Sequence, residues 1–363
     1  MKKLLLSLLV VIVAASVQAK SWKIGPSSVT GMDFASINAA MSSSNVSEGD
    51  TLYLNHYYST SATQTITKRV VVIGTGYDKS QIDENVVATL TGILELKANN
   101  VQVKSVKLAY VYFYNEDCIL DRCYATYIYY NSIYAGINHV YSCYIEGRIS
   151  GNDSSNKSMI DLQNSVVRVD FSSTSGGYGS NLIQYFYNSI FNNNILYFSH
   201  SNATSNNPSY YTLQSITNSQ ITNNYIYDYW YYYNNSSYKG NENTLSSNTV
   251  SIGSGNTIEH NVLNGSSGLT ANYPNNRISS TYATLANVFT CTGTYSNYYQ
   301  LSEKSPCKGY ATDGGDVGCH GGMFGCPSGG RPQYIPYFTK VTVGSRSEDG
   351  KLPVSISVKI QDE

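Results

Sequence analysis

The chain has 363 residues, a formal net charge of −1 and 13% charged residues, against about 25% in ordinary globular domains. Nucleic acid is not an expected partner, because phosphate binding requires clustered cations. In place of charge the chain carries 35 tyrosines. Tyrosine suits flat amphipathic contacts and neutral hydrogen bonds, as glycan binding requires. It also fills strands simply because of its β propensity.

Residues 1–19 have the layout of a secretory signal. A basic start is followed by the apolar run from Leu4 to Ala15 and by small residues that end at Ala19. The run is short for a membrane span, and no later stretch approaches the roughly 20 apolar residues that a span requires. We therefore expect cleavage near Ala19 and a mature protein that is secreted, periplasmic or at the cell surface, with no membrane span.

Residues 20–48 are predicted to form an N-terminal cap. The stretch from Asp33 to Met41 predicts a short helix that Asp33 caps, with Phe34, Ile37 and Met41 on one face. A stack of strands leaves an open edge at each end, and an amphipathic helix is a common way to cover it.

A repeated unit dominates the middle of the chain. The sequence Asn188-Ser189-Ile190-Phe191-Asn192-Asn193 recurs, with variations, at earlier and later positions. Alignment on one corner residue per unit gives steps of 17, 20, 22, 24 and 30 residues, for the corners Ser105, Arg122, Ser142, Asn164, Asn188 and Asn218. Repeats of about 20 to 30 residues made of short β-type runs predict stacked strands, one coil per repeat. The longer late steps predict projecting loops at residues 201–209 and 234–243.

Three segments carry a family resemblance. The opening helix, the Gly-Asp-Thr strand from Gly49 to Leu54 and the Val/Ile run that ends in Gly74-Thr75-Gly76 resemble the start of a right-handed parallel β-helix of the pectate-lyase-like superfamily. Residues 304–322, rich in Gly and Cys, resemble the closing segment of secreted bacterial β-helix proteins. The resemblance implies an all-β, right-handed parallel β-helix over residues 49–330, and it matches no specific enzyme family.

Residues 331–363 differ from the coils. The stretch from Val354 to Ile360 alternates apolar and polar residues, and Tyr337 to Val343 offers a partner strand. We predict an antiparallel β-hairpin. A cover for the C-terminal side of the solenoid is the favoured role, and attachment to another structure is the alternative.

The seven cysteines leave alternatives open. Cys123 and Cys143 hold equivalent places in adjacent coils, about 4.8 Å apart, so they form either a disulfide or two buried thiols. The better disulfide candidates lie in the Gly-rich end, where four cysteines allow three connectivities; they are Cys291, Cys307, Cys319 and Cys326.

A charged group is the first candidate site. With the step of 22, Glu146 falls over Arg168, and Arg148 falls over Asp170. These residues form either cross-strand ion pairs, worth about 0.2 to 1 kcal/mol each, or a catalytic group in which Glu146 or Asp170 is the acid or base and an arginine holds a uronate. The neighbouring coils supply Asn in place of further carboxylates, so we expect no metal and no cofactor.

Tyrosine rows are the second candidate site. Five tyrosines of one parity would place their rings on one side of a strand, with Asp228 and Trp230 on the other; they are Tyr225, Tyr227, Tyr229, Tyr231 and Tyr233. With the step of 17, Tyr110 stacks on Tyr127, and Tyr112 stacks on Tyr129. The rows are either platforms for sugar rings or strand filling. A third pair, Asp316 and His320, has metal-ligand or acid–base potential but fits a turn-stabilising network better.

The leading functional hypothesis is recognition of polysaccharide through the tyrosine rows. A polysaccharide lyase or glycoside hydrolase that uses the charged group is the second hypothesis. A structural or adhesive surface protein with the β-helix as a rigid spacer is the third. The scaffold supports all three, so the fold alone does not choose.

Overall fold

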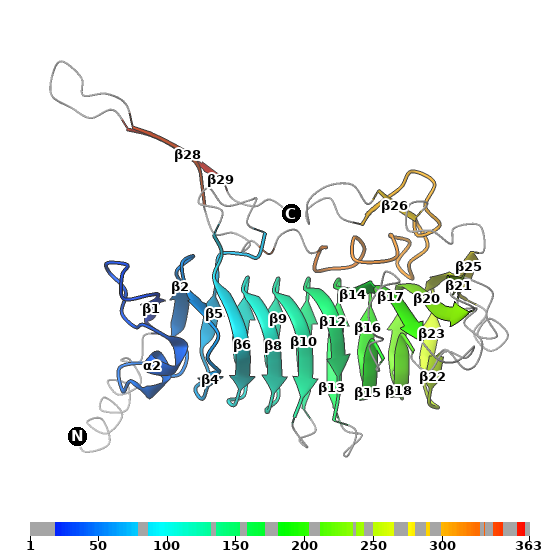
Figure 1. Ribbon diagram of the computed structural model, residues 1–363, viewed down its shortest axis with the longest axis horizontal. Helices are drawn as coiled ribbons and strands as arrows, with labels where there is room; N and C mark the ends of the chain where they lie inside the picture. The colour runs from blue at the N-terminus through cyan, green and yellow to red at the C-terminus, as the bar shows by residue number, and fades with distance from the viewer. Residues whose placement is uncertain are drawn as a thin grey trace, which may run out of the picture.

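The computed structural model describes residues 19–78, 86–131, 136–152, 158–170, 181–202, 211–234, 237–242, 250–264, 275–279, 288–290, 299–326, 330, 337–343 and 354–359. They form an all-β molecule with long parallel sheets and one short helix, which is consistent with a parallel β-helix (Figure 1). Two sheets run along the stack, and the coils from β2 to β23 contribute strands to both.

The first sheet, sheet A, has ten strands among the described residues. In stacking order they are β1 (Ser21–Ile24), β2 (Thr51–Leu54), β5 (Val71–Ile73), β7 (Gln102–Lys104), β9 (Ile119–Asp121), β11 (Ile137–Tyr141), β13 (Met159–Gln163), β16 (Ile190–Asn192), β19 (Gln220–Thr222) and β23 (Thr257–Glu259). All neighbours in this sheet pair in parallel.

The second sheet, sheet B, has more strands than sheet A and contains the longest ones. Its main path is β3 (Ser59–Thr60), β6 (Thr89–Leu96), β8 (Lys107–Phe113), β10 (Tyr124–Tyr130), β12 (Tyr144–Ser150), β14 (Val166–Asp170), β17 (Ile195–Asn202), β20 (Tyr225–Asn234), β24 (Val262–Asn264) and β25 (Arg277–Ser279). Off this path lie β4 (Gln64–Ile66), β15 (Ile183–Tyr187), β18 (Leu213–Thr217), β21 (Ser237–Glu242) and β22 (Val250–Ile252). Antiparallel pairing of β21 with β20 places a strand where we expected a loop.

Alternation along each strand fills the interior of the coils. In sheet A the inward residue at one register position is apolar in nine successive coils: Leu52, Val72, Val103, Leu120, Val140, Leu162, Phe191, Ile221 and Ile258. All nine are buried. Successive side chains point to opposite faces of a strand, so the residues between them face outward and carry the polar and aromatic groups described below.

One corner of the coil is built from residues with left-handed backbone. Ser142, Asn164 and Asn193 have φ of 51°, 50° and 55°, a region that Asn tolerates better than most residues. Because β13 pairs with β16, the residue that occupies this corner after Asn164, in the next coil, is Asn193. Our alignment on Asn188 and Asn218 was wrong, since both belong to the other corner. The two corners share a left-handed Asn followed by a buried polar residue, which made them interchangeable in the sequence.

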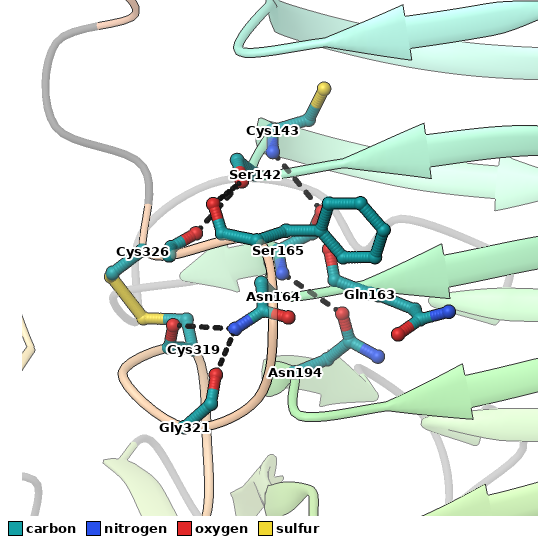
Figure 2. Close-up of a disulfide and its surroundings, with 11 residues drawn as sticks. Ser142, Cys143, Gln163, Asn164, Ser165, Asn194, Cys319, Gly321 and Cys326 are labelled. Atoms are coloured by element: carbon teal, nitrogen blue, oxygen red, sulfur yellow. Dashed lines mark hydrogen bonds between the residues drawn. A yellow bond between two sulfur atoms is a disulfide. The ribbon is translucent and has the colours of Figure 1, made fainter. Parts of the chain in front are cut away.

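An inward polar ladder follows this corner. Each member accepts a hydrogen bond from the backbone N–H of the member before it, at 2.9 to 3.4 Å, in the order Cys123, Cys143, Ser165, Asn194, Asn224, Asn261 and Asn276. Figure 2 shows the steps from Cys143 to Asn194. Cys123 and Cys143 are thus two buried free thiols and do not form a disulfide.

The helix is shorter than predicted. α2 (Ile37–Ser42) starts after the N-cap Ser36, whose side chain accepts from the backbone N–H of Ala39. Asp33 instead accepts from the backbone N–H of Lys23 at 2.7 Å. Ile37 and Met41 are buried as expected. Phe34 lies outside the helix and packs on Trp22, with ring centroids 5.5 Å apart.

The Cys/Gly-rich segment packs along the side of the coils rather than on their end (Figure 1). We call residues 305–326 the lateral segment. Tyr310 contacts His260 of a late coil, Asn164 of an earlier coil binds the backbone of Cys319, and Ser142 binds the carbonyl of Phe324 at 2.7 Å. The segment therefore runs back along the left-handed corners, one coil after another.

The remaining strands form two small antiparallel pairs. β26 (Phe289–Thr290) pairs with β27 (Gln300–Leu301). β28 (Tyr337–Val343) pairs with β29 (Val354–Lys359), which is the expected hairpin. Figure 1 shows this hairpin beside the early coils and extending away from the stack, not across its C-terminal end.

Candidate functional site

A ridge of tyrosines lies on the outer face of sheet B. β8 and β10 pair in the register that places Tyr110 beside Tyr127 and Tyr112 beside Tyr129. The two ring pairs are stacked, with centroids 5.3 and 5.1 Å apart and planes 15° and 27° from parallel. Both pairs were predicted from the step of 17 residues. We call these four residues, together with Tyr114, the tyrosine ridge.

The ridge offers edges and hydroxyls more than ring faces. Within a stacked pair each ring covers one face of its neighbour, and Tyr127 also stacks beside Tyr129, with centroids 6.1 Å apart. Tyr110 at the rim is 38% exposed. Burial raises the pKa of Tyr129, so its hydroxyl stays a neutral hydrogen-bonding group. A ligand on this surface would meet a row of phenol groups repeated at the coil spacing.

Charged side chains border the ridge. The Arg148 guanidinium lies over the Tyr127 ring, 5.5 Å from its centroid, and Lys97 lies over Tyr114 at 4.7 Å. The Glu95 carboxylate pairs with Lys97 at 2.7 Å and accepts from the Tyr114 hydroxyl at 3.1 Å. Burial alone would raise the pKa of Glu95, but its hydrogen bonds, above all that from Lys97, lower it. A fixed anion and two cations therefore flank a neutral aromatic surface.

Amides continue the surface on the later coils. The register Tyr129, Ser150, Gln184 and Gln214 passes from β10 through β12 and β15 to β18. Gln184 donates to the Ser150 hydroxyl at 3.1 Å and accepts from Asn181 at 2.7 Å. Asn181 also binds Gln214. The outer face of sheet B thus changes from phenols to amides along one line of coils.

The predicted charged group begins in the expected register. Tyr144 pairs with Val166, a step of 22 residues. β12 then takes one extra residue relative to β10, at Gly147, where a Cβ would lie 2.0 Å from the carbonyl oxygen of Thr126. Only glycine fits this close approach.

Three side chains of the charged group contact tyrosines. Exposed Glu146 accepts from the Tyr124 hydroxyl at 2.5 Å. Arg168 lies over the Tyr197 ring, 5.3 Å from its centroid, much as Arg148 lies over Tyr127. The side chain of Asp170 lies outside the described residues.

The row on β20 is partly covered. Tyr225 and Tyr227 are 1% and 8% exposed. They share one side of the strand as predicted, and this side faces outward. Tyr225 packs edge-on against Phe289 with centroids 4.9 Å apart, and Tyr227 stacks on Tyr197 at 4.7 Å. Both belong to an apolar cluster with residues from the 288–319 region. Asp228 is buried on the opposite side and accepts from Thr212 at 2.8 Å. The side chains of Tyr229, Tyr231 and Tyr233 lie outside the described residues.

A third constellation, on the outer face of sheet A, was missed by sequence reasoning. His139 pairs with Asp161 across β11 and β13, and its Nδ1 lies 3.2 Å from Asp161 Oδ2. The Tyr141 hydroxyl donates to the same oxygen at 2.5 Å, and Gln163 donates to Oδ1 at 2.7 Å. The step of 22 that was applied to Glu146 also connects His139 with Asp161, so the signal was present but unused.

Asp316 has the turn-stabilising setting that we favoured for this pair. Asp316 accepts from the backbone N–H of Gly309 at 2.9 Å, across a turn of the lateral segment. Donor atoms of Cys319, exposed His320 and Cys326 lie within 4.8 Å of one another. The two sulfurs are joined in a disulfide, which selects one pair among the predicted cysteines. Cys307 is a buried free thiol, and Cys291 lies outside the described residues.

Comparisons with protein-family models, with curated proteins and with solved structures gave no match. Among the described residues, no helix has the length and apolarity needed to cross a membrane.

Proposed function

We propose that the protein recognises an extended polysaccharide with the outer face of sheet B. The observation that carries the proposal is the repetition of tyrosine at the coil spacing, with Tyr110 on Tyr127 and Tyr112 on Tyr129. A polymer laid along the coils would meet equivalent tyrosines on β8 and β10 and then the amides of the later coils. Phenols and amides bind hydroxyl-rich ligands by neutral hydrogen bonds.

The position of the site differs from our first expectation. Tyr225 and Tyr227 are covered, so the proposal moves from β20 to the ridge on β8 and β10. Arg148 at the rim would hold an acidic sugar if the polymer contains one, because a guanidinium forms paired hydrogen bonds with a carboxylate. The amides of Gln184 and Gln214 extend the same line toward later coils.

Native gels that contain single polysaccharides test this proposal. The mature protein should be retarded by at least one polymer of a plant, host and microbial panel, with the polymer left intact. Tyr127→Ala should lose most of the retardation, because it removes the ring between Tyr110 and Arg148. Tyr57→Ala is the matched control, since Tyr57 is 46% exposed and lies outside the ridge. Equal retardation of both variants would refute the assignment.

A polysaccharide lyase or glycoside hydrolase is the second candidate function. The observation in its favour is the exposed carboxylate of Glu146 on β12, in the same coil as Arg148 and next to the ridge. Glu146→Gln preserves shape and removes the charge. Polymer cleavage by the wild type that this variant lacks would establish the enzyme. Retardation by an intact polymer, unchanged in Glu146→Gln, would support recognition instead. A rigid surface spacer predicts neither retardation nor cleavage.

We also propose export and a right-handed coil of the pectate-lyase-like type. The signal-like residues 1–19 support export. The parallel stacked sheets support the coil, and its hand follows from the rule that crossovers between parallel strands are right-handed in almost all folds. The same proposal gives α2 the role of covering the first coil.

N-terminal sequencing of the protein recovered outside the cytoplasm should begin near Lys20. A product that keeps Met1 and stays in the cytoplasm would contradict export.

A further inference from the structure

The cluster of His139, Tyr141 and Asp161 is unusual for the outer face of a sheet. Asp161 faces outward, yet it is only 7% exposed, because its neighbours surround it. A buried carboxylate costs free energy unless hydrogen bonds satisfy it. Here Oδ2 receives the Tyr141 hydroxyl and faces His139 Nδ1, and Oδ1 receives Gln163. Burial alone would raise the pKa of Asp161, but these bonds lower it, so the group is an anion.

The hydrogen bonds fix the tautomer of the imidazole. Three atoms meet at this point, namely His139 Nδ1, the Tyr141 oxygen and Asp161 Oδ2. Nδ1 lies 2.7 Å from the tyrosine oxygen and 3.2 Å from Oδ2, and the tyrosine oxygen lies 2.5 Å from Oδ2. The carboxylate has no proton, and the tyrosine proton points to it. Nδ1 must therefore carry a proton to make its two contacts favourable. In the neutral ring the lone pair is then on Nε2.

Nε2 is the available atom of the cluster. Within the described part of the chain, the polar contacts of the His139 ring are all made by Nδ1, and the side chain is 24% exposed. Asp161 has both oxygens occupied, so it cannot serve as an acid or a nucleophile. Tyr141 is engaged with Asp161, and burial raises its pKa, so it is not a base at neutral pH. A carboxylate that orients an imidazole and stabilises its protonated form is the arrangement of a general base.

We propose that His139 is a catalytic base for hydrolysis of carboxylic esters at the face of sheet A, with Asp161 and Tyr141 as positioning residues. Nε2 takes a proton from water while the water oxygen forms a bond to the acyl carbon. The Nε2–H then returns this proton to the ester oxygen as the acyl C–O bond breaks. The products are an acid and an alcohol, and no further reactant is needed. Ester hydrolysis fits better than glycoside cleavage, which requires two free carboxyl groups.

This activity is independent of polysaccharide binding, because the cluster lies on sheet A and the tyrosine ridge on sheet B. The test therefore uses a small soluble ester, 4-nitrophenyl acetate, and the mature full-length chain with its disulfide intact. Release of 4-nitrophenolate by the wild type should exceed that of His139→Asn by about a hundredfold or more, the lower end of the range for general base catalysis. Asn in this position can still donate to Asp161, which protects the fold.

Two further variants separate catalysis from structure. Asp161→Asn should also lose most of the activity, because the imidazole is no longer held in the reactive tautomer. His320→Ala should keep the wild-type rate, since His320 is exposed and makes none of the hydrogen bonds of the His139 cluster. Thermal unfolding of each variant checks that the fold is retained. A wild-type rate equal to that in buffer, or full activity in His139→Asn, would overturn the proposal. Full activity in Asp161→Asn would overturn the positioning role of Asp161.

Discussion

At the scale of single residues, buried amides connect the later coils. The side chain of Asn224 accepts from the backbone N–H of Asn194 at 2.9 Å and donates to the carbonyl of Phe191 at 2.8 Å. It also donates to Asn261 at 3.0 Å. Asn224 is fully buried. Polar chains of this kind are favourable only when every member is satisfied, since water cannot replace a missing partner.

Asn224→Ala should therefore lower the free energy of unfolding by about 2 kcal/mol or more, because it leaves at least two buried groups without partners at about 1 to 3 kcal/mol each. Urea unfolding measures the change. Gln220→Ala is the matched control, since Gln220 is exposed on the same coil, and it should change stability by less than about 0.5 kcal/mol. A value for Asn224→Ala as small as that of the control would contradict the role of the ladder.

At the scale of elements, Asp50 connects the first strand to the second coil. Its carboxylate accepts from the backbone N–H of Lys20, the Trp22 indole and the backbone N–H of Ser47, at 2.7, 2.7 and 2.9 Å. Burial alone would raise the pKa of Asp50, but the hydrogen bonds lower it below its usual value of 3.8. The carboxylate therefore stabilises the fold when ionised.

This stabilisation is complete above the unfolded-state pKa and is lost as pH falls through the lower folded-state pKa. We expect β1 to loosen below about pH 4, with a red shift of Trp22 fluorescence. The measurement uses Trp230→Phe, because the chain has two tryptophans. Adding Asp50→Asn should produce part of the shift already at neutral pH. If the emission of both proteins stays constant from pH 7 to pH 2, Asp50 does not hold this strand.

The lateral segment is the second element that depends on a few contacts. The disulfide between Cys319 and Cys326 closes a loop with a sequence separation of 7. The Phe324 ring in this loop stacks on Tyr141 with centroids 4.0 Å apart, and Asn164 binds the backbone of Cys319 (Figure 2).

Replacing both cysteines by serine should lower the free energy of unfolding by about 2 to 3 kcal/mol, the loop-entropy value for a ring of this size. Proteolysis should then cut within residues 305–326 before it cuts the coils. Cys307→Ser serves as the control because Cys307 is a free thiol. Simultaneous loss of the segment and the coils would show that the segment is an integral part of the coil fold.

At the scale of the whole molecule, the sequence predicted what depends on repetition. Short β runs at repeated steps indicated parallel stacking, and the step of 17 placed Tyr110 on Tyr127. Prediction from the sequence failed where two different structural features look alike in sequence. The two corners both use Asn, so the alignment moved from Asn164 to Asn188 instead of Asn193. Burial of Tyr225 depends on residues more than 60 positions later, which no local pattern encodes.

In the candidate sites too, features that depend on repetition were predicted and features that depend on long-range contacts were not. Stacking of the ridge required only the register of two adjacent strands, and it was predicted. The His139 cluster required the same arithmetic together with a reason to examine sheet A, which Asp161 supplies only once its burial is known. The cover over β20 comes from a long-range contact between Tyr225 and Phe289.

If one line of coils binds a repeating polymer, affinity depends on the length of the ligand. Calorimetry with oligosaccharides of increasing length, prepared from the polymer that retards the protein, measures this dependence. Affinity should rise as the oligomer extends from β8 over β10 and β12 to β15, and then level off once the ridge and the amides are covered. Affinity that is independent of length, or absent with every polymer of the panel, would contradict recognition along the coils.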